Sequence, residues 1–302
     1  MAFASTPELA SAVTAGGGLG CIGAGFDSTA ELKTKIQKIR MDLKITKETP
    51  VPLAIGFIGW ILDMTEVSDD PRLLAILDEL PTAIWFAFGT DLGSYIAQVH
   101  AHDQKHGRKT FIFVQVNSVE RALRYAPEVD CLVVQGIEAG GHGGSESPPL
   151  FTLLQAVISA VPSGPLVVAA GGISTGAQIA SLLTMGADGV KDVILKAGHN
   201  ATVRTLAYDD MGRTNGWPPK FDGRAISNKV MEDLAAGLSL EDRRAKFDES
   251  TSKGEDCRLV IWAGVGVGIT NKITATSGVL RELHEEAVEK LQAGASLLGN
   301  DS

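Results

Sequence analysis

The sequence lacks the features that mark several large classes of protein. Its three cysteines, Cys21, Cys131 and Cys257, lie far apart and form no Cys-x-x-Cys pair, which argues against a disulfide framework or a cysteine-based metal site. No apolar run approaches 18 residues, so no membrane-spanning helix is expected. The net charge of −9 argues against nucleic acid or an anionic membrane as the main partner.

The chain also shows no targeting signal. Its N-terminal segment has no basic leader and reaches Glu8 after a short stretch, unlike a secretory signal peptide. Cys21 and Cys131 lie inside apolar runs, as buried and reduced thiols do. We therefore expect a cytoplasmic protein, and the sequence leaves its oligomeric state open.

Short apolar runs alternate with amphipathic stretches over the first 190 residues. The runs are rich in β-branched or aromatic residues and most end in glycine, as buried parallel strands do. They occupy residues 18–25, 51–58, 83–89, 110–116, 131–136 and 166–172, and the helical stretches occupy 6–15, 28–38, 71–80, 92–102, 118–126 and 150–160. This alternation predicts a parallel sheet with right-handed crossovers, and the number of units favours an α/β barrel of the TIM type, (β/α)8, over an open doubly wound sheet.

The pattern changes after residue 190. Residues 209–228 are rich in Gly, Pro, Asp and Asn and predict an ordered surface excursion. A charged helix is expected from Glu241 to Glu249, a glycine-rich loop at 262–268, and a closing helix from Gly278 to Ala293 that packs on the barrel. We divide the chain accordingly into a barrel, residues 1–200, and a C-terminal excursion with closing helices, residues 201–302.

Two glycine-rich segments follow neighbouring predicted strands. Gly171 and Gly172 end one strand just before a helix begins, and N–H groups at such a helix start attract phosphate. The segment QGIEAGGHGG, residues 135–144, places His142 at the barrel mouth, where barrel enzymes keep their active sites. An inert surface histidine is the alternative. Glycines are entropically costly, and so many in one loop are explained if the backbone packs against a flat ligand.

The segment QGIEAGGHGG resembles the histidine loop of the nitronate monooxygenases, formerly called 2-nitropropane dioxygenases, which are flavoenzymes with an FMN-binding TIM barrel. FMN-dependent enoyl-acyl-carrier reductases share a similar loop, so the resemblance is more specific for the superfamily than for the reaction. The likeness covers nearly the whole chain and extends to residues 5–25, 86–89, 114–122, 167–174, 186–190, 217–228 and 262–268.

The resemblance implies a cofactor, a reaction and a set of site residues. It implies FMN as cofactor, with oxidation of alkyl nitronates or nitroalkanes by O2 to carbonyl compounds and nitrite. His142 is then the catalytic base, or the polar group that faces the nitronate. Glu138 either ties the loop down or lies in solvent. The implied cofactor-binding residues are Gln115, Gln135, Gly136, Gly140 and Gly141 around the flavin ring and ribityl chain, and Gly171 and Gly172 at the phosphate.

The chain departs from the family pattern in two places. Family members begin with a strand that ends in a Pro-Met-Ala-like turn, whereas this chain begins Met-Ala-Phe-Ala. The segment GADGV, residues 186–190, continues into KDVILKAGHNATVRT in place of a Gly-Thr-Arg-Phe-like phosphate loop. We therefore expect a barrel that lacks strand one and part of strand eight. The alternatives are an NAD(P)H-dependent enoyl-reductase-like flavoenzyme and an inactive truncated remnant of the family.

Overall fold

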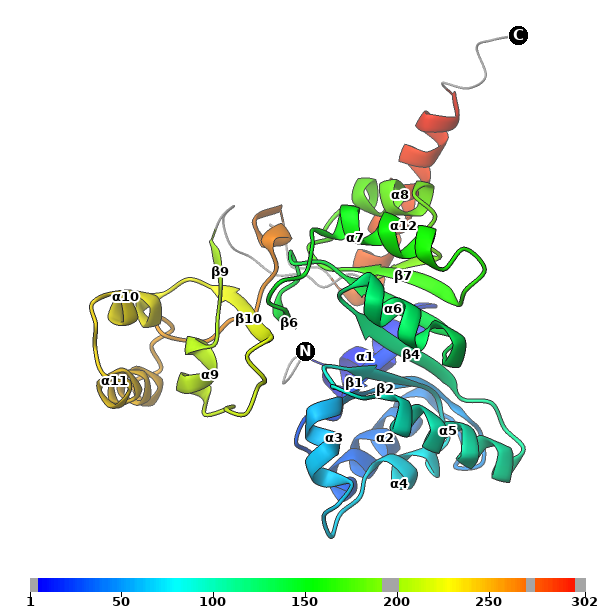
Figure 1. The fold of residues 1–302 in the computed structure, drawn as a ribbon, viewed down its shortest axis with the longest axis horizontal. Coiled ribbons are helices and arrows are strands. Elements are labelled where there is room, and N and C mark those ends of the chain that lie inside the picture. Colours follow the sequence, from blue (N-terminus) through cyan, green and yellow to red (C-terminus); the bar gives the residue numbers. More distant parts are fainter. Residues whose placement is uncertain (1–4, 192–200, 270–274, 297–302) are drawn as a thin grey trace.

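A seven-stranded parallel sheet forms the centre of the structure, a computed structural model that describes residues 5–191, 201–269 and 275–296 (Figure 1). The strands pair in chain order, which confirms the predicted α/β class. All six predicted strands are present, with a seventh formed from the GADGV segment. They are β1 (Gly20–Gly23), β2 (Val51–Ile58), β3 (Pro81–Ala87), β4 (Phe111–Val116), β5 (Cys131–Gln135), β7 (Leu166–Ala170) and β8 (Gly189–Lys191).

Helices connect these strands, and the N-cap residues of several helices hydrogen-bond to the first turn through their side chains. Ser28 and Thr175 each accept a hydrogen bond from the N–H three residues on, and Glu31 and Gln178 bond back to the cap, so both are capping boxes. The connecting helices are α1 (Pro7–Ala15), α2 (Thr29–Leu43), α3 (Gly59–Thr65), α4 (Leu73–Leu77), α5 (Gly93–His106), α6 (Val119–Tyr125), the 3-10 turn η1 (Ala126–Glu128), α7 (Leu150–Ala160) and α8 (Gly176–Thr184).

The two faces of the sheet carry different side chains because successive residues of a strand point to opposite sides. One face packs against the helices and forms the main hydrophobic core, with Ile55, Ile84 and Leu132 fully buried. The other face carries a smaller cluster that includes Cys131 and Val133. Burial raises the pKa of the Cys131 thiol to about 12, which agrees with the expected inert cysteine.

The C-terminal part forms a small lobe beside the main sheet (Figure 1). Its antiparallel sheet has the order β6-β10-β9, so a strand of the histidine loop pairs with the C-terminal segment. The predicted ordered excursion, residues 209–228, contains β10, and the predicted histidine loop contains β6; neither strand was expected from the sequence. The elements are β6 (Gly141–Gly144), β9 (Thr202–Thr205), α9 (Ala207–Gly212), β10 (Phe221–Ile226), α10 (Lys229–Ala235), α11 (Leu240–Ser252) and the 3-10 helix η2 (Val265–Ile269).

The main sheet is open between β1 and β8 within the described residues, because each of these strands pairs with one neighbour there. The closed eight-stranded ring of a complete TIM barrel is therefore not formed by the described strands. The expected losses in strand one and strand eight fall on residues 1–4 and 192–200, which lie outside the described residues.

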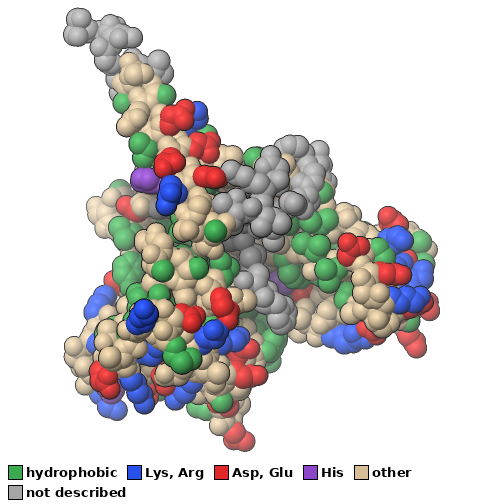
Figure 2. Space-filling model, turned by 180° about the vertical axis from the view of Figure 1, so that it is seen from behind, with side chains coloured by type: hydrophobic (Ala, Val, Ile, Leu, Met, Phe, Trp, Pro, Cys, Tyr) green, Lys and Arg blue, Asp and Glu red, His purple; other side chains and the backbone are tan. Residues whose placement is uncertain are grey.

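The predicted closing helix is α12 (Thr276–Ser296), and it contacts helices from both ends of the open sheet. At α8, a Cβ on Gly176 would lie 2.5 Å from Cβ of Glu286, so the two helices approach closely. At the end of α1, a Cβ on Gly16 would lie 2.9 Å from Leu280. The helix therefore bridges the two ends, and its far end projects from the body with acidic and basic side chains exposed (Figure 2).

Asp233 of α10 is a buried carboxylate that ties the lobe together. Its Oδ2 accepts from Nε of Arg258 at 2.9 Å, and its Oδ1 accepts from Nζ of Lys246 at 3.2 Å. The hydrogen bond from Arg258 lowers the pKa of Asp233. A carboxylate with a lowered folded-state pKa stabilises the fold above its unfolded pKa, and that contribution is lost as the pH falls through the folded value.

We therefore expect Asp233→Asn to lower the melting temperature by several degrees at pH 7, with the difference from wild type shrinking as the pH falls below about 4. Circular dichroism melts from pH 7 to pH 3 measure it. The control is Asp248→Asn, which breaks an exposed pair with Arg213 and is expected to have little effect. If the melting temperatures of wild type and Asp233→Asn differ by the same amount down to pH 3, the ionised Asp233 carboxylate is not what stabilises the lobe.

Candidate active site

Gln115 and Gln135 lie side by side at the carboxyl ends of adjacent strands β4 and β5. Gln115 is two residues after Phe113 and Gln135 is two residues after Val133, so both point to the sheet face that carries the smaller apolar cluster. Nε2 of Gln115 donates to Oε1 of Gln135 at 3.0 Å. The structure thus brings together two of the residues predicted from the sequence.

His142 lies on β6, and the C-terminal lobe surrounds its imidazole. Nε2 lies 3.0 Å from Oδ1 of Asp209, which is buried on α9. The ring stacks on Trp217, with centroids 3.5 Å apart and planes 5° from parallel, and Trp262 lies 4.9 Å away. Oδ1 of Asp209 also accepts from the Thr214 hydroxyl at 3.0 Å. The side chain of His142 is 12% exposed, so the surface-histidine alternative does not describe it.

Two buried polar atoms of the His142–Asp209 pair lack a hydrogen-bond partner among the described residues. Nε2 of His142 and Oδ1 of Asp209 are at ion-pair distance, 3.0 Å, but do not form a hydrogen bond. Among the described residues, neither this Nε2 nor Oδ2 of Asp209 has a hydrogen-bond partner, although both atoms are buried. Buried polar atoms are ordinarily satisfied, so the pair has capacity for a polar ligand.

Glu138 and two arginines hold the histidine loop in place. Both carboxylate oxygens of Glu138 accept from the backbone N–H of Leu150 at the start of α7, so Glu138 ties the loop down. Arg204 and Arg224 both donate to the carbonyl of Ile137 from the small sheet. Burial, and then the charge of Arg204, lower the pKa of Arg224. No sequence pattern pointed to either arginine.

The glycines predicted to contact the cofactor lie mostly against protein atoms. A Cβ on Gly140 would overlap the backbone of Gly264, and one on Gly136 would lie 2.5 Å from the backbone nitrogen of Leu150. A Cβ on Gly172 would lie 2.7 Å from Glu138. Gly141 differs, because its φ of +69° is left-handed and the space beside it is open. Close packing of chain segments explains several of these glycines, and their contact with a cofactor stays a prediction.

Aromatic side chains crowd the region beside His142. Trp60 stands edge-on to both Phe26 and Trp217, and Trp217 stands edge-on to Phe88. Three of the four tryptophans, Trp60, Trp217 and Trp262, therefore lie here. Their role was not predicted from the sequence, although Trp217 and Trp262 lie in stretches that carry the family resemblance. A pocket of about 10 Å³ remains, lined by residues that include Phe88, Gln115, Asn117, Gln135 and Phe221.

The predicted phosphate corner is covered by the chain itself. The N–H groups of Gly176 and Ala177, at the start of α8, donate to the carboxylate of Glu286 on α12 at 2.8 and 3.2 Å. The hydroxyl of Ser174 donates to the carbonyl of Gly266 at 3.1 Å, which places η2 over the preceding turn. A carboxylate from the closing helix therefore occupies the helix start that the sequence assigned to a phosphate.

The sequence profile of the nitronate monooxygenase family matches residues 1–286. The chain belongs to the nitronate monooxygenase family. This family consists of flavin-dependent oxidoreductases, so the chain is an enzyme of that class. The nitronate monooxygenase of Neurospora crassa is 28% identical over 326 residues, covering 94% of this chain and 86% of the relative. That of Paraburkholderia phytofirmans is 32% identical, covering 98% and 93%.

Solved structures agree on the fold of this nitronate monooxygenase family member. A nitroalkane oxidase from Streptomyces ansochromogenes superposes with a TM-score of 0.73 at 22% identity, covering 97% of this chain and 95% of the other. FabK from Thermotoga maritima gives 0.74 at 23%, covering 98% and 93%. At these identities the likeness shows the fold alone. Among the described residues, no helix is long and apolar enough to cross a membrane.

Proposed function

We propose that this chain is an FMN-dependent nitronate monooxygenase, which uses O2 to oxidise alkyl nitronates or nitroalkanes to carbonyl compounds and nitrite. The observation that carries the proposal is His142, paired with buried Asp209 and stacked on Trp217 at the carboxyl end of the main sheet. Trp217, on which His142 stacks, stands edge-on to Phe88. Phe88 lines the same pocket as Gln115 and Gln135, so the histidine and the glutamine pair belong to one site. Family membership supports the same reaction.

The residues present fit the ring end of FMN. Gln115 and Gln135 offer amide donors and acceptors at adjacent strand ends, which suits the heteroatoms of an isoalloxazine. Open space beside Gly141 leaves room for a ligand there. When bound, FMN would supply the redox and oxygen chemistry. We assign residues 1–200 to the flavin-binding barrel and residues 201–302 to a C-terminal excursion and closing helices that pack on the barrel.

His142 would act on the substrate through the nitrogen that Asp209 does not face. A carboxylate beside Nε2 favours the proton on that nitrogen and leaves Nδ1 able to accept. Nδ1 would then remove the α-proton from a neutral nitroalkane or, when protonated, would orient an anionic nitronate. Trp217 and Trp262 fix the plane of the ring and exclude water from its face. We treat His142 as the catalytic residue and Asp209 as its positioning residue.

The carboxylate of Glu286 would compete with the phosphate of FMN for the N–H groups at the start of α8. We assign Gly171 and Gly172 to the phosphate, beside the helix start that the Glu286 carboxylate now holds. Like charges at close range oppose each other, so a phosphate must approach against this carboxylate. The pocket of about 10 Å³ is also far below the roughly 300–1,000 Å³ typical of ligand sites, so this region must open to admit FMN.

We therefore expect Glu286→Gln to tighten FMN binding about 5- to 10-fold, since a like-charge contact partly shielded by solvent is worth about 1 kcal/mol. A titration followed by quenching of flavin fluorescence measures the dissociation constant. Glu285→Gln is the matched control, because it removes the same charge from an exposed position on the same helix. If the two variants bind FMN equally well, Glu286 does not compete with the phosphate.

The experiment that tests the proposed function is an absorbance scan of the purified protein with and without FMN. Stoichiometric binding, with flavin bands and quenched flavin fluorescence, is the expected result. Bleaching of the bound flavin by NAD(P)H and its reoxidation by an enoyl substrate, without oxidation of nitronates, would favour an enoyl-reductase-like activity. If the protein does not bind FMN even at high concentration, the enzymatic proposal is wrong and the chain is an inactive remnant of the family.

A further inference from the structure

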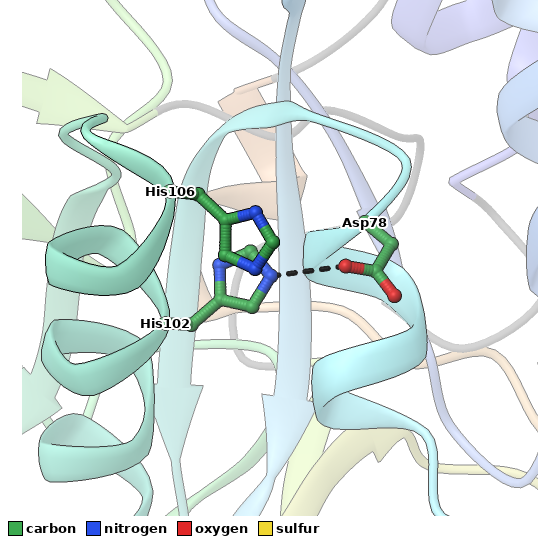
Figure 3. A group of neighbouring side chains, drawn as sticks. All are labelled: Asp78, His102 and His106. Atoms are coloured by element: carbon green, nitrogen blue, oxygen red, sulfur yellow. Dashed lines mark hydrogen bonds and ion pairs between the residues drawn. The ribbon is translucent and has the colours of Figure 1, made fainter.

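Three potential metal ligands lie close together near the amino ends of the strands, at the end of the sheet remote from His142 (Figure 3). His102 and His106 are one turn apart on α5, so both imidazoles lie on one side of that helix. Asp78, the C-cap residue of α4, faces them from the neighbouring helix. Asp78 lies just before β3 begins, so the group sits at the amino ends of the strands, whereas His142 lies beyond their carboxyl ends.

The distances suit a shared ion. Nε2 of His102 lies 3.0 Å from Oδ1 of Asp78, and one ligand atom from each residue lies within 4.8 Å of the others. Two ligand atoms each about 2.1 Å from a tetrahedral zinc ion are about 3.4 Å apart. The rings of His102 and His106 stack with centroids 4.4 Å apart, so a modest rotation of the exposed His106 ring would complete the set.

The surroundings also suit a bound cation. The side chain of His102 is 7% exposed, which fixes one ligand in place, while Asp78 and His106 face solvent and leave an entry path. Nδ1 of His102 is buried with no hydrogen-bond partner among the described residues, and Oδ1 of Asp103 lies 4.0 Å from it. A carboxylate near the second nitrogen is the usual outer neighbour of a metal-bound histidine.

We propose that Asp78, His102 and His106 bind one divalent transition-metal ion of the zinc class. Two imidazoles and one carboxylate select such an ion over Mg²⁺ or Ca²⁺, which prefer sites made of oxygen ligands. Water would complete the coordination. Because the ion joins the end of α4 to α5 and lies far from the proposed active site, it stabilises the fold and takes no part in nitronate oxidation. The proposal stands independently of the assigned reaction.

The test is calorimetric titration of the untagged protein with zinc sulfate at pH 7.5, with thermal melts in parallel. We expect one ion with micromolar affinity and, at about 100 times the dissociation constant, a rise in melting temperature of roughly 5 °C. His106→Ala should weaken binding at least 10-fold and remove the rise. The control is His100→Ala, because His100 is on the same helix but contacts the carbonyl of Glu128.

Each outcome decides the proposal. Loss of binding in His106→Ala with retention in His100→Ala supports the site, and magnesium sulfate should leave the melting temperature unchanged. Because His106 is exposed, its alanine variant should melt like metal-free wild type. Equal zinc affinity in wild type and His106→Ala, or no binding to wild type, would overturn the site.

Discussion

Replacing His142 with alanine is expected to lower kcat/KM for a nitroalkane by about 10²- to 10⁴-fold, the usual contribution of a positioned acid–base group. The lobe orients the imidazole from several sides, through Asp209, Trp217 and Trp262. Its removal takes away the proton acceptor without altering the Gln115–Gln135 pair, so FMN affinity should change little. Initial rates of oxygen uptake with FMN-loaded protein measure the effect.

Comparing two substrates separates the two roles open to His142. A neutral nitroalkane needs its α-proton removed, whereas a preformed nitronate does not, so a base predicts a much larger loss with the nitroalkane. Equal losses would indicate that the histidine orients the anion. The control is His100→Ala, an exposed histidine on α5 that should keep full activity. If His142→Ala keeps nitroalkane turnover within a few-fold of wild type, the assignment of His142 fails.

Replacing Gly140 with alanine is expected to destabilise the protein and disorder the site together. The new Cβ would overlap the backbone of Gly264 and crowd Ala263, and a backbone cannot turn aside as a flexible side chain can. Overpacking of this kind costs about 1–3 kcal/mol, so a fall in melting temperature of roughly 5 °C is expected. The displaced segment carries Trp262, so tryptophan fluorescence should shift to longer wavelength and nitronate turnover should fall.

Gly141→Ala is the matched control for this change. Its Cβ would meet open space, and the cost is the left-handed φ of +69°, about 1 kcal/mol. The control should therefore melt closer to wild type and keep its tryptophan spectrum. Equal effects at the two positions would show that backbone conformation, and not close packing of residues 263–264, is what requires glycine at residue 140.

The main sheet could be predicted from the sequence because its strands carry their own signal. Apolar runs such as residues 131–136 are buried on both faces, and amphipathic stretches separate them at regular intervals. Strand β6 could not be predicted, because three of its four residues are glycine, which has a low strand propensity. Its partner β10 lies about 80 residues further along, so only the tertiary fold makes β6 a strand.

The site was partly predictable for the same reason. His142, Gln115 and Gln135 follow or end strands of the main sheet, so their meeting at one edge follows from the topology. Asp209 and Trp217 come from the lobe, and no local pattern links them to residue 142. The occupation of the α8 start by Glu286 was also hidden, since it depends on how α12 packs across the open edges of the sheet.

The most direct test of the proposed function is oxygen uptake and nitrite release by the FMN-loaded protein with propyl-2-nitronate. The proposal predicts oxygen consumption and nitrite formation that saturate with the nitronate, depend on FMN and collapse in His142→Ala on a nitroalkane substrate. Tight FMN binding with no nitrite from any alkyl nitronate or nitroalkane would contradict the proposed reaction, even though the family and the fold would stand.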